Sequence, residues 1–311
     1  HVRSLEVEQL LAQSADVARG AAEAFGALDN ADLRFGLVQD EEGNEFELTK
    51  ARHGLLLRSQ DRATRKRSYE TFTRSYLDHK HTLAAMHSAS IRNDVFYARA
   101  HNHETAREAA LFSNNVPTSV YDTLIASVRS AGPVFERYLD LRRKLLGLTD
   151  LAAYDLLVPL SPEPEARYEY RSGVDEVLGG LSLLGDDYVA KLRAGFDQRW
   201  VDVHETRGKR SGAYSSGAYG APPVILMNWN GTMNDVFTLA HEAGHAMHSL
   251  LADESLPFHE AGYPIFLAEI ASTVNEVLLT WSLLESLPED DAAGRFAILD
   301  RFAEAFYGTV V

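Results

Sequence analysis

His241, Glu242 and His245 give the segment TLAHEAGHAMH the pattern His-Glu-x-x-His. On an α-helix, side chains four residues apart lie on one face, so both imidazoles can reach a single metal ion. Glu242 lies one position along the helix, where its carboxylate can act as a general base beside the ion. The pattern therefore predicts a hydrolytic metal centre. Two solvated histidines and an ordinary glutamate are the alternative that the pattern alone leaves open.

A third ligand is expected, because catalytic zinc takes three protein side chains and keeps one position open. Leu251 stands ten residues after His241, which excludes the class of zinc proteases with a third histidine there. The helical segment IFLAEIASTVNEVLLTW offers Glu269 instead, and Glu276 two turns on is placed to accept a hydrogen bond from a ligand imidazole. Both glutamates face away from the apolar stripe, which consists of Leu267, Ile270, Val274, Leu278 and Trp281. Solvated helix acids are the alternative for the two glutamates.

The elements that must position these residues are mostly helices. Apolar residues recur at three- and four-residue spacing from Ser4 to Leu28 and through most of the chain, which predicts a mainly α protein. Two β-branched, apolar runs, at 200–205 and 224–229, indicate a small β element before the metal-binding helix. A Gly-rich loop joins them. An exposed edge in the second run, including Leu226 and Asn228, would pair with an extended peptide, and a covered structural strand is the alternative.

Composition limits the class of partner. The 311 residues carry a net charge of −15, which disfavours nucleic acids and anionic membranes as partners. There is no cysteine, so a metal ion must be held by histidine and carboxylate, and we expect one zinc ion per chain. The N-terminal residues lack the apolar core of a signal peptide, and no stretch approaches the length of a membrane span. We therefore expect a cytoplasmic protein.

The longer segments around these residues resemble a known family. NWNGTMNDVFTLAHEAGHAMHS, FLAEIASTVNE, REAALFSNNVPTSVYDTLI and GKRSGAYS resemble the oligoendopeptidase F branch of the thimet-oligopeptidase-like zinc peptidases, and the resemblance extends over the whole chain. The family motif falls on His241, Glu242, Gly244, His245 and Glu269. The resemblance implies an elongated multi-helix fold with a deep channel for short peptides. Residues 1–165 would form a helical wall and residues 166–311 the catalytic portion.

The resemblance also bears on substrate contacts and on completeness. It strengthens the expectation that Gly212, Ala213 and Tyr214, in the Gly-rich loop, contact the substrate. Family members are longer than this chain, and the His and Tyr cluster that binds their substrates would follow Val311. We expect a surface exposed by this truncation, which includes Phe302, Phe306 and Tyr307, to favour self-association.

Three functions fit the sequence. The first is a zinc metalloendopeptidase, or a fragment of one, that hydrolyses oligopeptides with a metal-activated water and Glu242 as the general base. The second is a truncated helical module that binds zinc without catalysis. The third is a carboxypeptidase with a similar metal-binding helix.

Overall fold

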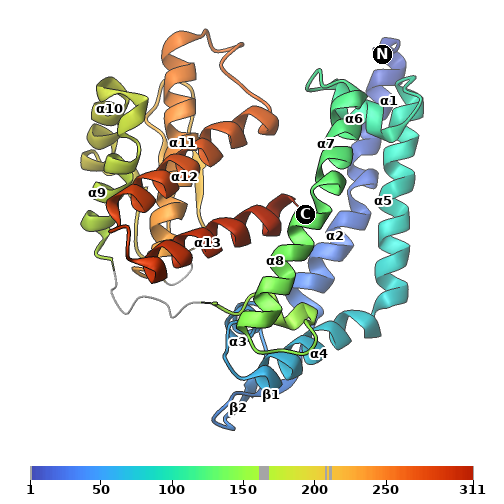
Figure 1. Cartoon of the computed structure of the whole chain (residues 1–311). Coiled ribbons are helices and arrows are strands. Elements are labelled where there is room, and N and C mark those ends of the chain that lie inside the picture. Colours follow the sequence, from blue (N-terminus) through green and yellow to red (C-terminus); the bar gives the residue numbers. More distant parts are fainter. Residues whose placement is uncertain (1, 161–167, 207–208, 210–211, 311) are drawn as a thin grey trace. The chain divides into compact units, whose positions relative to one another are not determined.

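The computed structural model describes residues 2–160, 168–206, 209 and 212–310, and they are mainly α-helical. The chain divides into two compact units, residues 1–160 and 161–309 (Figure 1). The expected domain boundary at 165, and the loop expected at 161–165, lie outside the described residues. No helix among those described is long and apolar enough to cross a membrane.

The first unit is built from helices and one hairpin. Its elements are α1 (Leu5–Ala18), α2 (Gly20–Ala27), the π-turn η1 (Leu28–Asp32), β1 (Leu37–Gln39), β2 (Glu45–Glu47), α3 (Lys50–Leu56), α4 (Arg62–Asp78), α5 (Lys80–Ala100), α6 (Ala106–Phe112), α7 (Thr118–Ser130), α8 (Gly132–Leu145) and the 3₁₀ turn η2 (Ala153–Asp155). The helical pattern predicted from Ser4 is confirmed, and Thr105 caps α6, where its side chain accepts the backbone N–H of Glu108.

A buried ion pair fixes η2 against α4 in the first unit. The side chain of Asp155 is fully buried, and its carboxylate accepts hydrogen bonds from Arg65 at 2.8 Å and Arg62 at 2.9 Å. Burial raises the pKa of Asp155, but the bonds from Arg62, the Ala152 N–H and Arg65 outweigh burial and lower it. A smaller apolar cluster lies beside the hairpin, where Phe35 stacks on Phe72 with ring centroids 4.6 Å apart.

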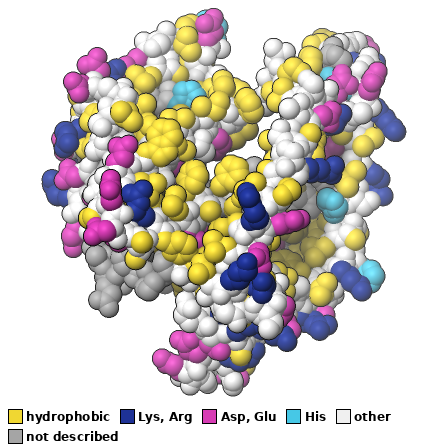
Figure 2. Space-filling model, viewed as in Figure 1, with side chains coloured by type: hydrophobic (Ala, Val, Ile, Leu, Met, Phe, Trp, Pro, Cys, Tyr) yellow, Lys and Arg dark blue, Asp and Glu magenta, His cyan; other side chains and the backbone are white. Residues whose placement is uncertain are grey.

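The second unit carries the predicted metal-binding residues. Its elements are α9 (Tyr170–Gly180), the 3₁₀ turn η3 (Ser182–Leu184), α10 (Asp186–Asp197), β3 (Val201–Asp202), β4 (Tyr214–Ser216), β5 (Val224–Leu226), α11 (Met233–Ser255), α12 (Ile265–Ser286) and α13 (Ala292–Val310). The larger core of the chain lies here, between α9, α11 and α12. Figure 2 shows that hydrophobic side chains also gather on the surface of this unit.

The small sheet of this unit differs from the expected two-stranded element. Its strand order is β3-β5-β4, with β5 parallel to β3 and antiparallel to β4. The runs at 200–205 and 224–229 do contain strands, but the third strand, β4, lies in the segment expected to be a Gly-rich loop. Only pairing with β5 marks it as a strand, because Tyr-Ser-Ser carries no apolar run.

Candidate metal centre

Helix α11 presents the histidines on the face opposite its buried stripe. It begins with a capping box, in which the Thr232 hydroxyl accepts the Asp235 N–H at 3.2 Å and Asp235 accepts the Thr232 N–H at 2.9 Å. The residues that turn toward the core are fully buried, namely Val236, Ala240, Ala243 and Met247. His241 and His245 remain partly exposed on the other face, as the helical spacing predicted.

At Gly244, between the two histidines, the backbone of α12 lies directly against α11. A Cβ atom on Gly244 would lie 2.6 Å from the carbonyl oxygen of Ala271 and 2.7 Å from the Cα of Ser272. Both contacts are with backbone, which has no flexible end to move aside. The glycine of the motif therefore permits an approach of two helix backbones that no other residue would allow.

The face that α12 buries is not the one its apolar stripe suggests. Ile270, Val274 and Trp281 of that stripe are 51%, 42% and 55% exposed, respectively. The buried positions are instead Ala268, Ser272, Asn275, Leu279, Thr280 and Leu283. Near Gly244 this face carries Ala268, Ser272 and Asn275 in place of large apolar residues, because the α11 backbone leaves little room there. The Asn275 side chain donates to the Ala240 carbonyl at 2.9 Å.

Three ligand atoms meet beside this crossing. The Nε2 atoms of His241 and His245 are 3.2 Å apart, and Oε2 of Glu269 lies 3.5 Å from the first and 3.6 Å from the second. A zinc ion bound tetrahedrally at its usual bond lengths of roughly 2.0–2.2 Å separates its ligand atoms by about 3.3–3.6 Å. The donor set and its spacing therefore fit zinc. This is the one such group of His and carboxylate side chains among the residues that the structure describes.

Two further side chains hold the ligands in place. Glu276 Oε1 lies 2.8 Å from Nδ1 of His241, so it accepts that N–H and leaves Nε2 for a metal. The Ser272 hydroxyl donates to Oε2 of Glu269 at 2.9 Å. Burial lowers the pKa of His241, but the hydrogen bond and charge of Glu276, with Glu242 and Glu269, raise it overall. Glu276 thus lies where the helical spacing predicted, in hydrogen-bond contact with His241.

Arg301 of α13 is a member of this network that sequence reasoning missed. Its guanidinium lies 3.7 Å from Oε2 of Glu276 and 3.5 Å from the centroid of the Phe237 ring. Burial lowers the pKa of Arg301 to about 10, although Glu276 and Glu304 oppose the shift. No motif marks this arginine, because it reaches the site only through the packing of α13.

Glu242 lies beside the ligands in a protected position. Its side chain is 6% exposed, and burial raises its pKa, while the charge of His241 and the backbone N–H of Ser215 act in the opposite direction. Its Oε2 atom is buried and has no hydrogen-bond partner among the described residues. A carboxylate with a free oxygen and a raised pKa suits the role of a general base.

Strand β4 turns toward Glu242 the edge that pairs with no other described strand. The N–H groups of Ile225 and Met227 donate to the carbonyls of Trp200 and Asp202 at 2.8 and 2.9 Å, on the β3 side, so Val224 and Leu226 face β4. They pair with Ser216 and Tyr214. Because backbone groups alternate along a strand, the N–H and C=O of Ser215 point away from β5. They face the unpaired edge, where the Ser215 N–H acts on Glu242.

The residues expected to contact substrate have separate places in this sheet. The expectation that β5 is an exposed edge is wrong, because β5 is the central strand and Leu226 pairs with Tyr214 of β4. The Asn228 side chain donates to the Gly212 carbonyl at 2.8 Å and so anchors the start of β4. Gly212 has a φ of +85°, which favours glycine, and leads through Ala213 into the edge strand.

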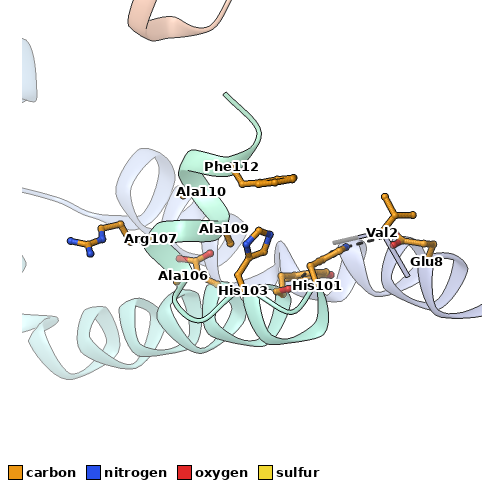
Figure 3. Close-up of a pocket in the computed structure, with 12 residues that line it drawn as sticks. Val2, Glu8, His101, His103, Ala106, Arg107, Ala109, Ala110 and Phe112 are labelled. Atoms are coloured by element: carbon orange, nitrogen blue, oxygen red, sulfur yellow. Dashed lines mark hydrogen bonds and ion pairs between the residues drawn. The ribbon is translucent and has the colours of Figure 1, made fainter. Parts of the chain in front are cut away.

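A larger cavity lies in the first unit. It has a volume of about 890 Å³ and lies between α1, α5 and α6 (Figure 3). His103 points into it beneath Phe112, while His101 lies 3.7 Å from Glu8, at the other side. The walls are mainly apolar, and none of the metal-binding group lines them.

Comparisons with known proteins agree with this geometry. The model of Peptidase family M3 matches residues 55–309, and that of Oligopeptidase F matches residues 1–35. The chain is 42% identical over 310 residues to Oligopeptidase PepF of Bacillus subtilis, covering all of this chain and 46% of that protein. It is 40% identical to an oligoendopeptidase F homolog of Lactococcus lactis, covering 51% of it.

Solved structures give the same result. A peptidase from Chlamydophila abortus superposes with a TM-score of 0.86 at 39% identity, over 99% of this chain and 51% of that one. Oligoendopeptidase-F from Enterococcus faecium superposes with a TM-score of 0.74 at 32% identity, over 100% of this chain and 48% of that one. The chain spans about half the length of the relatives it matches.

The close approach at Gly244 predicts that Gly244→Ala separates α11 from α12. We expect the free energy of unfolding to fall by about 1–3 kcal/mol, and zinc affinity to fall with it, because Glu269 is carried by α12. Urea unfolding and zinc titration measure both quantities. Gly179→Ala is the matched control, since a Cβ at Gly179 meets nothing within 4 Å. Unchanged zinc affinity in Gly244→Ala would contradict the proposed role of the helix spacing.

The ligand geometry predicts graded effects on zinc binding. His241→Ala and Glu269→Ala each remove one of three ligand atoms, and we expect zinc to be lost on dialysis. Glu276→Gln keeps all three ligands but weakens the hold on His241, so we expect zinc affinity to fall about 10–100-fold. Elemental analysis and competition with a chelator provide the readout, with the exposed Glu285→Gln as control. Full zinc occupancy in both alanine variants would refute the site.

Proposed function

The chain belongs to peptidase family M3, and on that premise we propose that it carries the catalytic centre of a zinc metalloendopeptidase that cleaves short oligopeptides. The observation that carries the proposal is the triangle of His241, His245 and Glu269 ligand atoms beside the buried carboxyl group of Glu242. The names of the relatives, oligopeptidase and oligoendopeptidase, support oligopeptides as the substrate class.

The protein's own groups have distinct roles in this proposal. His241, His245 and Glu269 would hold one zinc ion, and Glu276 fixes the tautomer and orientation of the His241 ring. Zinc, when bound, supplies Lewis-acid chemistry that polarises water and the scissile carbonyl. Glu242 takes a proton from the attacking water and transfers it to the leaving amine nitrogen.

The free edge of β4 supports a binding mode for the peptide backbone. Ser215 directs its N–H and C=O away from the sheet at the point where Glu242 lies. An extended peptide that pairs with this edge would make main-chain hydrogen bonds there, whatever its side chains are. The scissile bond would then lie next to the carboxylate that moves the proton. This arrangement agrees with peptides of varied sequence as substrates.

The role of Glu242 predicts that Glu242→Gln retains zinc and loses turnover. The amide keeps the size of the side chain but cannot accept the proton, so we expect turnover to fall by about 10²–10⁴-fold. The substrate is an internally quenched peptide with an amidated C-terminus, assayed on this chain and on the chain extended to the length of its relatives. A chelator should abolish the wild-type activity, and added zinc should restore it.

The same assay separates the other functions. Cleavage inside the amidated peptide supports an endopeptidase, whereas cleavage only of peptides with a free C-terminus supports a carboxypeptidase. Zinc binding without turnover in either chain supports a module that binds metal without catalysis. Activity of Glu242→Gln within about tenfold of the wild type would show that this residue is not the base, since general-base catalysis is worth more.

The edge-strand binding mode predicts that Ser215→Pro weakens substrate recognition. Proline is tolerated at a sheet edge, where no ladder bond is lost, but it removes the outward N–H together with the contact of that N–H with Glu242. Because the loss of that contact acts on kcat, the binding mode is measured by KM, which we expect to rise about tenfold, the effect of one peptide hydrogen bond. Ser215→Ala keeps the N–H and should retain wild-type kinetics, with thermal unfolding as the check on both variants. Equal losses in the two variants would assign the effect to the side chain and contradict strand pairing.

A further inference from the structure

A second cavity opens at the C-terminal end of β4. Its volume is about 430 Å³, and its walls come from the connection between β4 and β5, the second half of α11 and the loop that precedes α12. Tyr219 and Phe258 meet edge to face on one wall, with ring centroids 5.4 Å apart. The Tyr219 hydroxyl donates to the Leu256 carbonyl at 2.9 Å, so the connection is tied to the end of α11.

The cavity lies next to the part of α11 that follows the metal-binding residues. Ser249 lies one helical turn after His245 on the same face of α11, and its hydroxyl is 2.6 Å from that of Tyr263 on the cavity wall. His248 stacks on the Tyr263 ring with centroids 3.7 Å apart. On the strand side, Gly217 lines the cavity two residues after Ser215.

The strand and the helix run in the same direction here. Ser215 faces Glu242, and five residues later the Gly220 N–H donates to Asp253 at 3.3 Å. Two residues of extended chain span about 7 Å. A peptide paired with the edge at Ser215 therefore brings to the cavity a side chain about two residues from the scissile bond.

The residues that line the cavity are of the types that bind organic cations. Aromatic rings of Tyr219, Phe258 and Tyr263 surround the space, and the Asp253 carboxylate is the charged group in its wall. Among the described residues, no lysine, arginine or histidine forms an ion pair with Asp253, whereas the adjacent Glu254 is paired with Lys191. Aromatic faces attract guanidinium and ammonium groups, and a carboxylate binds them by charge-assisted hydrogen bonds.

We propose that this cavity is a subsite for an arginine or lysine side chain of the peptide substrate. The apolar walls take the methylene stem of the side chain, and Asp253 binds its charged head. The net charge of −15 of the chain agrees with attraction of cationic peptides. The proposal rests on the proposed peptidase function and names the preference of its substrate-binding groove.

The experiment compares arginine with citrulline, which has the same shape without the charge. Internally quenched peptides carry either residue at one position, from three residues before the scissile bond to three after it. We expect kcat/KM to be about tenfold higher for arginine at one position two residues from the cleaved bond. Asp253→Asn should reduce this preference to nearly one. Glu254→Gln, the neighbouring acid outside the cavity, should keep it.

The possible failures are distinguishable. Zinc-dependent cleavage with no arginine preference at any position, or a preference that Asp253→Asn retains, would overturn the subsite and leave the peptidase function standing. If no peptide is cleaved, the peptidase function fails, and the subsite is tested by calorimetry on the zinc-loaded Glu242→Gln chain. Arginine and citrulline peptides must then differ in affinity about tenfold, and Asp253→Asn must remove the difference. Equal affinities would overturn the subsite.

Discussion

The contact between the backbones of α11 and α12 at Gly244 is the constraint on which the site depends. One hydrogen atom, in place of a side chain, lets the Ala271 and Ser272 backbone lie against α11. Glu269 comes within 3.6 Å of both histidines only because its helix lies so close. A similar contact occurs two turns further along α12, where a Cβ on Gly180 of α9 would lie 2.8 Å from the Leu279 side chain. The ligand geometry is therefore a result of helix packing as much as of ligand identity.

The close packing of α11 and α12 brings several negatively charged side chains together. Glu242, Glu269 and Glu276 gather around two imidazoles, and the described cation nearest them is Arg301, 3.7 Å from Glu276. Partly buried carboxylates in such numbers repel one another, and a divalent cation at the triangle would offset that repulsion. The same repulsion contributes to the raised pKa of Glu242, and a cation bound at the triangle would act on that pKa in the opposite direction.

The sequence predicted the parts of the site that depend on one helix alone. His241, Glu242 and His245 follow from the four-residue repeat, and the direction of Glu269 and Glu276 follows from the same period. It did not predict which face of α12 is buried, because hydrophobic periodicity assumes that apolar residues point inward, and here backbone proximity selects Ser272 and Asn275 instead.

Elements defined by tertiary contacts were also missed. Strand β4 has no apolar pattern of its own, and β5 was taken for an edge because a sequence does not reveal its neighbours on either side. Arg301 reaches Glu276 from a helix with no motif in common with the site. The mainly helical fold was predicted correctly, because it depends on local periodicity.

The placement of Glu269 on a separate helix has a thermodynamic consequence. His245 and Glu269 are 24 residues apart in the sequence, so an ion held by both closes a loop of that length, much as a reversible cross-link would. The unfolded chain offers no such arrangement, and binding energy is then also folding energy. The tertiary structure of α11 and α12 is thereby linked by mass action to the free metal concentration, so that the surrounding medium sets how firmly these two helices are joined.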